Sequence, residues 1–194
     1  MNKNLLKYLP ILLVVCVAAV IVGVSLDYSF ISSKYYSFKI VNGNAEITEY
    51  NGSKKNVTVP EHVERNNKEY TVTSIGEYAF WCCDVKKVEI PETVVSIGSY
   101  AFRGSTIQEI ILPKTLKYIG SYTFSYCENL EYVVLSNTVE TIGNEAFAKC
   151  DNLSIYCDFE SVPNGFDESW NIDNNPVYLA GEWEYVSGVP QSIK

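Results

Sequence analysis

The sequence is poor in the side chains that most enzymes and metal sites need. It has a single histidine, His62, and no serine or cysteine stands around it in an arrangement typical of a nucleophile and its base. The six cysteines include no C-x-x-C pair, so zinc binding is not indicated. The acidic residues Asp167, Glu168 and Asp173 lack the spacing of an EF-hand calcium loop. These absences argue against an enzyme and predict no cofactor, no metal and no small-molecule substrate.

Clusters of basic side chains are also missing. The chain carries 15 lysines and arginines against 23 aspartates and glutamates, which gives a net charge of −8. Attraction to nucleic acid or to an anionic membrane surface requires Lys and Arg gathered in one place. The charge balance therefore argues against nucleic acid as a partner.

The sequence is instead rich in one motif, Ile-Gly-x-x-Ala/Thr-Phe, which occurs four times. It starts at Ile75, Ile97, Ile119 and Ile142, so successive starts lie 22, 22 and 23 residues apart. A fixed period in this range is typical of a repeat solenoid, in which each unit buries its apolar face only by stacking on its neighbours. The motif therefore predicts an array of coils, with each glycine at a backbone conformation or close approach that a side chain would forbid.

Each unit also carries a short apolar strand after its phenylalanine. The spacing L-x-x-L-x-L turns alternate side chains inward. The apolar triplets are Val85, Val88 and Ile90, then Ile107, Ile110 and Leu112, then Leu130, Val133 and Leu135. The last unit is shorter by one residue, which places Ile155 and Cys157 where Val133 and Leu135 stand one turn earlier. A proline follows each of the first two strands and ends it without removing a hydrogen bond from its middle.

A small or thiol position follows each phenylalanine. Cys83, Cys127 and Cys150 occupy it, with Ser105 or Gly104 in the remaining unit. These residues predict a buried inward column, where free cysteine behaves as a small hydrophobe. An exported domain permits disulfides, and adjacent coils lie within the range of a bridge. Parallel inward side chains give poor bridge torsions, however, so free thiols are favoured for the pair Cys127 and Cys150.

The combination of Ile-Gly-x-x-Ala-Phe, x-x-Cys, x-x-Leu-x-x-Val-x-Ile-Pro and x-x-Val resembles the BspA-type leucine-rich repeat, which is found mainly in surface proteins of bacteria and of some mucosal protists. The resemblance covers residues 57–159, with the regular repeats at 75–159. It implies a solenoid of short parallel strands with irregular or short helical convex segments. For some members it also implies adhesion or contact with host and matrix, although fold alone does not determine function.

The amino-terminal segment, residues 1–26, is apolar after Lys3 and Lys7. The run from Leu9 to Val24 has no charged side chain, and with its flanks it predicts one transmembrane helix over residues 5–26. A cleaved secretory signal is the alternative, since small residues before Leu26 form an acceptable cleavage site. Both lysines precede the run, so the positive-inside rule keeps the amino terminus in the cytosol and the repeats outside. We expect a single-pass cell-membrane protein, or a secreted one if the segment is cleaved.

The segments that flank the repeats are expected to cap them. A polar linker, 27–34, leads to residues 35–74, where apolar residues alternate around Asn42-Gly43-Asn44, a strong hairpin signal. This hairpin and an irregular opening repeat would cover the first coil, as terminal units of a solenoid must. Residues 160–194 are expected to form an aromatic cap over the last strand, followed by a loose tail after Gly181. The candidate capping residues there are Phe166, Trp170, Pro176, Val177, Tyr178 and Trp183.

The strands also predict an outer face, because the residues between the inward positions point out. Along the stack this row changes from charged to apolar and aromatic. The candidate partner-binding residues are Lys87, Glu89, Glu109, Ile111, Tyr132, Val134 and Tyr156. Exposed apolar patches with a polar rim often mark interaction sites, and tyrosine is favoured at hot spots. The alternative is that β-branched residues stand here only for their strand propensity.

A second row, Tyr78, Tyr100 and Tyr122, recurs within the Ile-Gly motif and is interpreted as packing between coils rather than as a ligand platform. Taken together, the patterns favour a non-enzymatic, membrane-anchored extracellular recognition protein whose strand face binds a protein or a surface polymer. The alternative is a structural spacer or cell-envelope scaffold whose faces bind nothing tightly.

Overall fold

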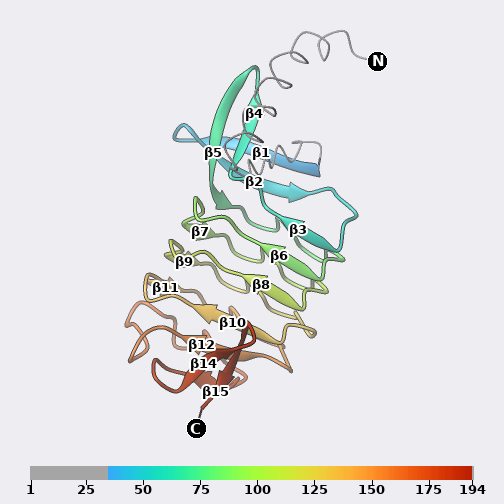
Figure 1. Ribbon diagram of the computed structural model, residues 1–194. Helices are drawn as coiled ribbons and strands as arrows, with labels where there is room; N and C mark the ends of the chain where they lie inside the picture. The colour runs from blue at the N-terminus through green and yellow to red at the C-terminus, as the bar shows by residue number, and fades with distance from the viewer. Residues whose placement is uncertain (1–34, 194) are drawn as a thin grey trace, which may run out of the picture. The chain divides into compact units, whose positions relative to one another are not determined.

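The structure is a computed structural model that describes residues 35–193, so the amino-terminal segment 1–26 and the linker 27–34 lie outside the described residues. The described chain winds into a stack of coils that contribute short strands to two sheets (Figure 1). The coils recur with the period of the motif, since Ile97 pairs with Ile75 on one side and with Ile119 on the other, in parallel register. The predicted repeat solenoid is confirmed.

The first sheet, sheet A, has the spatial order β1-β2-β5-β7-β9-β11, with β4 paired to β5. Its strands are β1 (Tyr36–Val41), β2 (Asn44–Tyr50), β4 (His62–Arg65), β5 (Lys68–Ile75), β7 (Ser96–Ile97), β9 (Tyr118–Ile119) and β11 (Thr141–Ile142). The pairs β1–β2 and β4–β5 are antiparallel, and the other pairs are parallel.

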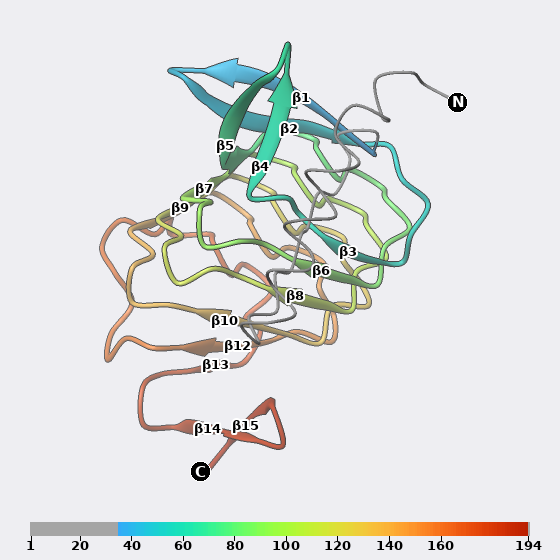
Figure 2. The same ribbon diagram turned by 45° about the horizontal axis from the view of Figure 1, so that its top comes forward.

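The second sheet, sheet B, is parallel throughout and lies on another side of the coils (Figure 2). Its strands, in spatial order, are β3 (Asn56–Thr58), β6 (Lys87–Glu89), β8 (Glu109–Ile111), β10 (Tyr132–Leu135), β12 (Ser154–Cys157) and β13 (Val177–Tyr178). Val133 pairs with Ile155 and Leu135 with Cys157, which is the register predicted for the shortened unit.

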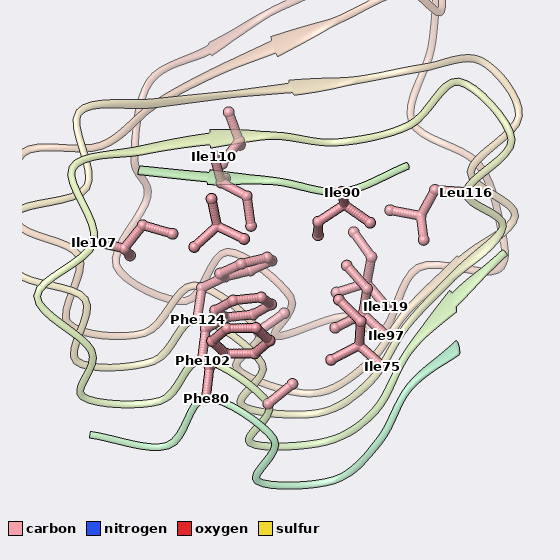
Figure 3. Close-up of a cluster of buried hydrophobic side chains, with 14 of the residues drawn as sticks. Ile75, Phe80, Ile90, Ile97, Phe102, Ile107, Ile110, Leu116, Ile119 and Phe124 are labelled. Carbon is pink, nitrogen blue, oxygen red and sulfur yellow. The ribbon is translucent and has the colours of Figure 1, made fainter. Parts of the chain in front are cut away.

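Two columns of side chains fill the interior (Figure 3). Phe80, Phe102, Phe124 and Phe147 are fully buried, and their rings stack with centroids 4.8 to 5.4 Å apart. The isoleucines of the Ile-Gly motif form the second column beside them. A buried side chain of this size contributes about 1.5 to 3 kcal/mol, and here it does so by contact with the coils above and below it.

The glycines of the motif stand where successive coils approach most closely. A Cβ added to Gly98 would lie 2.7 Å from the backbone nitrogen of Glu77, and one added to Gly120 would lie 2.4 Å from that of Ser99. Both contacts are with the backbone of the preceding coil, which cannot rotate away as a side chain can. Of the two roles expected for glycine, close approach is therefore the one that these positions require.

The segments after each Ile-Gly are turns, and no helix forms there within the described residues. Alternate amides of these turns bond to the next coil, and the amides between them close short i→i−3 turns within one coil, as Trp81 N does with Tyr78 O at 3.0 Å. Phe80 N donates to Ala101 O at 2.7 Å, and Phe102 N donates to Thr123 O at 2.9 Å. Because these amides are engaged by the next coil, they are not free for the i→i−4 bonds of a helix.

The amino-terminal cap is the predicted hairpin, β1–β2, which turns at Asn42 and Gly43. Strand β2 lies parallel to β5, and the ring of Tyr50 stacks on Phe80 with centroids 5.3 Å apart, so the hairpin covers the first coil. The polar stretch that precedes the first motif is a second hairpin, β4–β5, which turns at Asn66 and Asn67.

The carboxy-terminal cap is aromatic, as expected. Trp170 and Phe166 are buried against each other with ring centroids 5.3 Å apart, and Trp170 closes the phenylalanine column over Phe147. The tail expected to be loose after Gly181 is instead an antiparallel hairpin of β14 (Trp183–Val186) and β15 (Val189–Ser192). The hairpin lies at the carboxy-terminal end of the stack, beyond β13 (Figure 2).

Candidate functional site

The outer face of sheet B carries the candidate partner-binding residues in two parallel rows. Lys87 pairs with Glu109, and Glu109 pairs with Tyr132, which forms the first row. Glu89 pairs with Ile111 in the second row. The intervening inward residues Val88, Ile110, Val133 and Leu135 are buried, so the predicted alternation holds from β6 to β10, although Leu112, also predicted inward, is only partly buried.

The end of the face nearer the amino terminus is charged and internally paired. The Nζ atom of Lys87 lies 2.9 Å from a carboxylate oxygen of Glu109 and 3.6 Å from one of Glu89. The hydrogen bond to Glu109 raises the pKa of the Lys87 ammonium. Exposed ion pairs of this kind contribute about 0 to 1 kcal/mol, so this end is a polar margin with its charges already partnered.

The middle of the face is apolar. Ile111 is 45% exposed, and the neighbouring Tyr132 and Val134 are partly exposed. Burial raises the pKa of the Tyr132 hydroxyl, and the Glu109 carboxylate adds to the rise. Tyr185 of the carboxy-terminal hairpin also adds to the rise. We call the three residues Ile111, Tyr132 and Val134 the strand patch.

Tyr156 was expected on the exposed face, and that prediction is wrong. Its side chain is only 7% exposed. It does follow Val134 in register, but the ring of Tyr178 from β13 stacks on it at 5.0 Å, and the ring of Trp183 packs against it at 5.5 Å. The indole Nε1 of Trp183 also donates a hydrogen bond to Cys157 O at 3.0 Å. The carboxy-terminal segment therefore ends the accessible face before β12.

Sequence reasoning missed the carboxy-terminal hairpin, whose Trp183 packs on Tyr156, the register partner of Val134. Tyr185 is 59% exposed, and its ring packs edge-on against Trp183 with centroids 5.3 Å apart. A signal for the hairpin was present, because apolar residues lie on both sides of the Ser187-Gly188 pair, and Ser-Gly is a turn dipeptide. Both residues of that pair have positive φ, as a tight hairpin turn requires.

The second tyrosine row packs between coils, as interpreted from the sequence. Tyr78, Tyr100 and Tyr122 stack face to face with centroids 5.0 Å apart and interplanar angles of 9° and 8°. All three have a left-handed backbone, with φ of 61°, 59° and 57°. Such a conformation is unfavourable for a residue with a side chain by about 1 to 2 kcal/mol, and Glu145 at the equivalent position of the next coil shares it with a φ of 50°, so the turn of the repeat imposes it with or without a stacked ring.

The thiol column is buried at Cys127 and Cys150, whereas Cys83, also predicted to be buried, is only partly so; the cysteines of the described chain are free thiols. Cys127 Sγ donates to Phe102 O, and Cys150 Sγ donates to Phe124 O, each at 3.1 Å to the coil before. Burial raises the pKa of the Cys127 thiol to about 12. These thiols are inert donors within the core. Within residues 35–193, no cluster of His, Cys, Asp or Glu is arranged to hold a metal ion.

Comparisons with known proteins agree with this architecture. The family described as BspA type leucine rich repeat region matches residues 60–163, in six copies. A leucine-rich repeat protein from Bacteroides capillosus has a crystal structure that is 29% identical, with a TM-score of 0.59, over 64% of this chain and 94% of that one. No curated protein matches the chain.

Two further crystal structures are similar. The leucine-rich repeat protein of T. pallidum is 26% identical with a TM-score of 0.52, over 64% of this chain and 70% of that one. A leucine-rich cell surface protein from Faecalibacterium prausnitzii shares the fold at 18% identity, with a TM-score of 0.55 over 83% of this chain and 57% of that one. With the matched repeats covering more than half of its length, the chain belongs to the BspA-type leucine-rich repeat family.

Proposed function

We propose that this chain is a non-enzymatic, membrane-anchored extracellular protein that recognises a protein or a surface polymer through the outer face of sheet B. Membership of a family of surface repeat proteins supports the recognition role in general. Among the described residues, the candidate nucleophiles and base are poorly suited to catalysis, since the buried thiols are protonated donors and His62 is an exposed side chain 3.9 Å from Glu69. The choice of the outer face of sheet B as the binding surface rests on the side chains that this face presents.

The observation that carries the proposal is the strand patch. Ile111, Tyr132 and Val134 form an apolar surface on the parallel sheet, with the ion pairs of Lys87 on one side and, next to Val134 in register, Tyr156 covered by Trp183 on the other. Interfaces combine an apolar, aromatic centre with a polar rim, and tyrosine is over-represented among the residues that contribute most binding energy. Because the backbone of the patch is held in the sheet, little ordering is required when a partner binds.

A binding experiment with the full-length chain tests this proposal. The chain, displayed on cells, is cross-linked to its neighbours and recovered, and the partner that it retains is titrated against two variants. Tyr132→Ala combined with Val134→Ser should weaken binding by about 1 to 2 kcal/mol and change stability by only ~0.5 kcal/mol. Lys114→Gln, in the loop between the sheets, should bind as the parent chain does. A chain that retains no partner above background would favour the spacer role instead.

The membrane anchor is part of the proposal and rests on the sequence of residues 5–26. Among residues 35–193, no helix is long and apolar enough to cross a bilayer. Because Lys3 and Lys7 precede the apolar run, we expect the amino terminus in the cytosol and the repeats outside. The protein should stay in the membrane fraction after an alkaline carbonate wash and keep its first residues. A mature chain that begins near Leu26 would show that the segment is a cleaved signal.

A further inference from the structure

The turns of the coils carry a second surface, which the strand face does not include. Figure 3 shows the phenylalanine column across the interior from Ile110 of β8, so the turns that hold this column lie on the other side of the coils from sheet B. Five side chains on these turns, which we call the turn cluster, come from three successive coils. They are Tyr78, Trp81, Tyr100, Arg103 and Tyr126.

The register of the repeat places a cation between two exposed aromatic residues. Trp81 and Arg103 occupy equivalent positions in adjacent coils, and Cys82 N, next to Trp81, donates to Arg103 O at 2.9 Å. Tyr126 comes from the coil after Arg103. Trp81 is 56% exposed and Tyr126 is 47% exposed. Exposed apolar side chains gathered in one place often mark interaction sites.

Arg103 itself is held by rings and has no acidic partner. Its guanidinium carbon lies 5.0 Å from the ring centroid of Tyr126 and 5.6 Å from that of Tyr100. Within the described residues, its guanidinium makes no ion pair and donates no hydrogen bond. The other arginine of the sequence, Arg65, differs in this respect, because it donates to Phe38 O at 2.9 Å. Arg103 thus presents a planar set of N–H donors that a ligand could engage.

The turn cluster is also preformed. Tyr78 stacks on Tyr100, and Trp81 packs edge-on against Tyr78 with centroids 6.2 Å apart. Tyr100 stacks in turn on Tyr122 with centroids 5.0 Å apart, so its ring is held between two others. A ligand would therefore meet rings that are already ordered, which removes much of the entropic penalty of binding.

We propose that the turn cluster binds a saccharide that carries a single carboxylate, with Arg103 holding the carboxylate and Trp81 and Tyr126 packing on sugar rings. A guanidinium matches a carboxylate with two parallel hydrogen bonds. The negative face of an aromatic ring attracts the polarised C–H groups that a sugar ring presents on its flat side. A sugar ring that carries one carboxylate therefore suits both the guanidinium and the aromatic rings of the turn cluster.

Charge and size favour this ligand over two others. A polyanion would be repelled by a chain of net charge −8 that offers one unpaired arginine at the site. A protein partner of standard size buries about 800 Å² on each side, so it would have to extend well beyond these five side chains, whereas a short saccharide would not. An isolated carboxylate on an otherwise neutral saccharide meets neither objection.

The test is calorimetric titration of the full-length chain with an oligosaccharide that ends in one glucuronic acid, beside its neutral methyl ester. The acid should bind about tenfold or more tightly than the ester, since a charged hydrogen-bonded pair is lost in the ester. Arg103→Gln should weaken binding of the acid to the level of the ester and leave the ester unchanged. Trp81→Ala should weaken both, and Lys114→Gln, which also removes one positive charge, should weaken neither.

Equal binding of acid and ester, or undiminished binding of the acid by Arg103→Gln, would overturn the proposal, as would no binding at all. A glutamate-containing peptide that binds more tightly than the saccharide would assign the cluster to a protein partner instead. The strand-patch variant, Tyr132→Ala with Val134→Ser, should bind the acid normally, so this site and the strand face succeed or fail independently.

Discussion

The ring of Trp170 stands at 80° to the ring of Phe147, with centroids 6.0 Å apart, where the repeat would place another parallel ring. Every earlier step of the column, from Tyr50 to Phe147, joins rings within 17° of parallel. A perpendicular ring covers the last flat face with its edge and offers no equivalent face to a further coil. The change of angle ends the aromatic column.

Replacing this ring should destabilise the whole array. Trp170→Ala is expected to lower the free energy of unfolding by about 3 to 5 kcal/mol, the range for a buried tryptophan or phenylalanine, because it opens the end of the column. Trp81→Ala is the matched control, since that tryptophan is mostly exposed, and it should change stability by only ~0.5 kcal/mol. Urea unfolding curves of the two variants would contradict the capping role if their midpoints coincided.

The motif glycines should tolerate alanine less well than a turn glycine does. Gly120→Ala places a Cβ 2.4 Å from the backbone of Ser99, which forces two coils apart, and overpacking of this kind typically costs about 1 to 3 kcal/mol or more. Gly43→Ala meets no atom within 4 Å but must keep a φ of +81°, a strain of about 1 kcal/mol. Thermal melts should therefore rank Gly120→Ala below Gly43→Ala, and the reverse order would mean that the coils separate easily.

The features predicted from the sequence are those that repeat. The Ile-Gly period predicted the number of residues per coil, and alternation within each strand predicted the inward side chains. Both patterns recur in every unit, so each prediction is supported by several independent copies. The same alternation placed Lys87, Ile111 and Tyr132 on one face. A strand residue has only two faces to choose from, so local pattern is sufficient.

The features that sequence reasoning missed depend on contacts that occur at one place in the chain and do not recur in every repeat. Tyr156 has the alternation of an exposed residue and is buried because the rings of Tyr178 and Trp183, more than 20 residues further along the chain, pack on it. The β4–β5 hairpin was hidden by its polar composition, although Asn66 and Asn67 adopt the positive φ of a tight turn. No propensity rule places an aromatic residue at positive φ, so the backbone of the tyrosine row was also beyond prediction.

Loss of Trp183 should release the carboxy-terminal hairpin. An isolated two-stranded hairpin is marginally stable in water, and β14–β15 is anchored by the packing of Trp183 on Tyr156 and by its hydrogen bond to Cys157 O. Trp183→Ala should therefore make the segment after Gly181 susceptible to limited proteolysis while the repeats stay folded. Tyr185→Ala, which leaves that anchor in place, should be cleaved no faster than the parent chain.

The buried thiols predict a loss of stability at alkaline pH. Burial raises the pKa of Cys127 from 9.0 to about 12. Below pH 9 the thiol is protonated in both states, so it adds no pH dependence. Between about pH 9 and 12 the unfolded chain releases the proton and the folded chain keeps it, so stability falls as pH rises, at up to about 1.4 kcal/mol per unit.

Cys127→Ser isolates this contribution, because Ser105 already occupies the equivalent position one coil earlier and is buried there. A serine hydroxyl does not ionise in this range, and the other thiols are common to both chains. The stability of the parent chain relative to Cys127→Ser should therefore decrease by about 2 kcal/mol between pH 9 and 11. Denaturant unfolding at several pH values measures the difference. If the unfolding free energies of the two chains changed in parallel with pH, the folded chain would ionise this thiol as readily as the unfolded chain does. The thiol column would then be open to solvent.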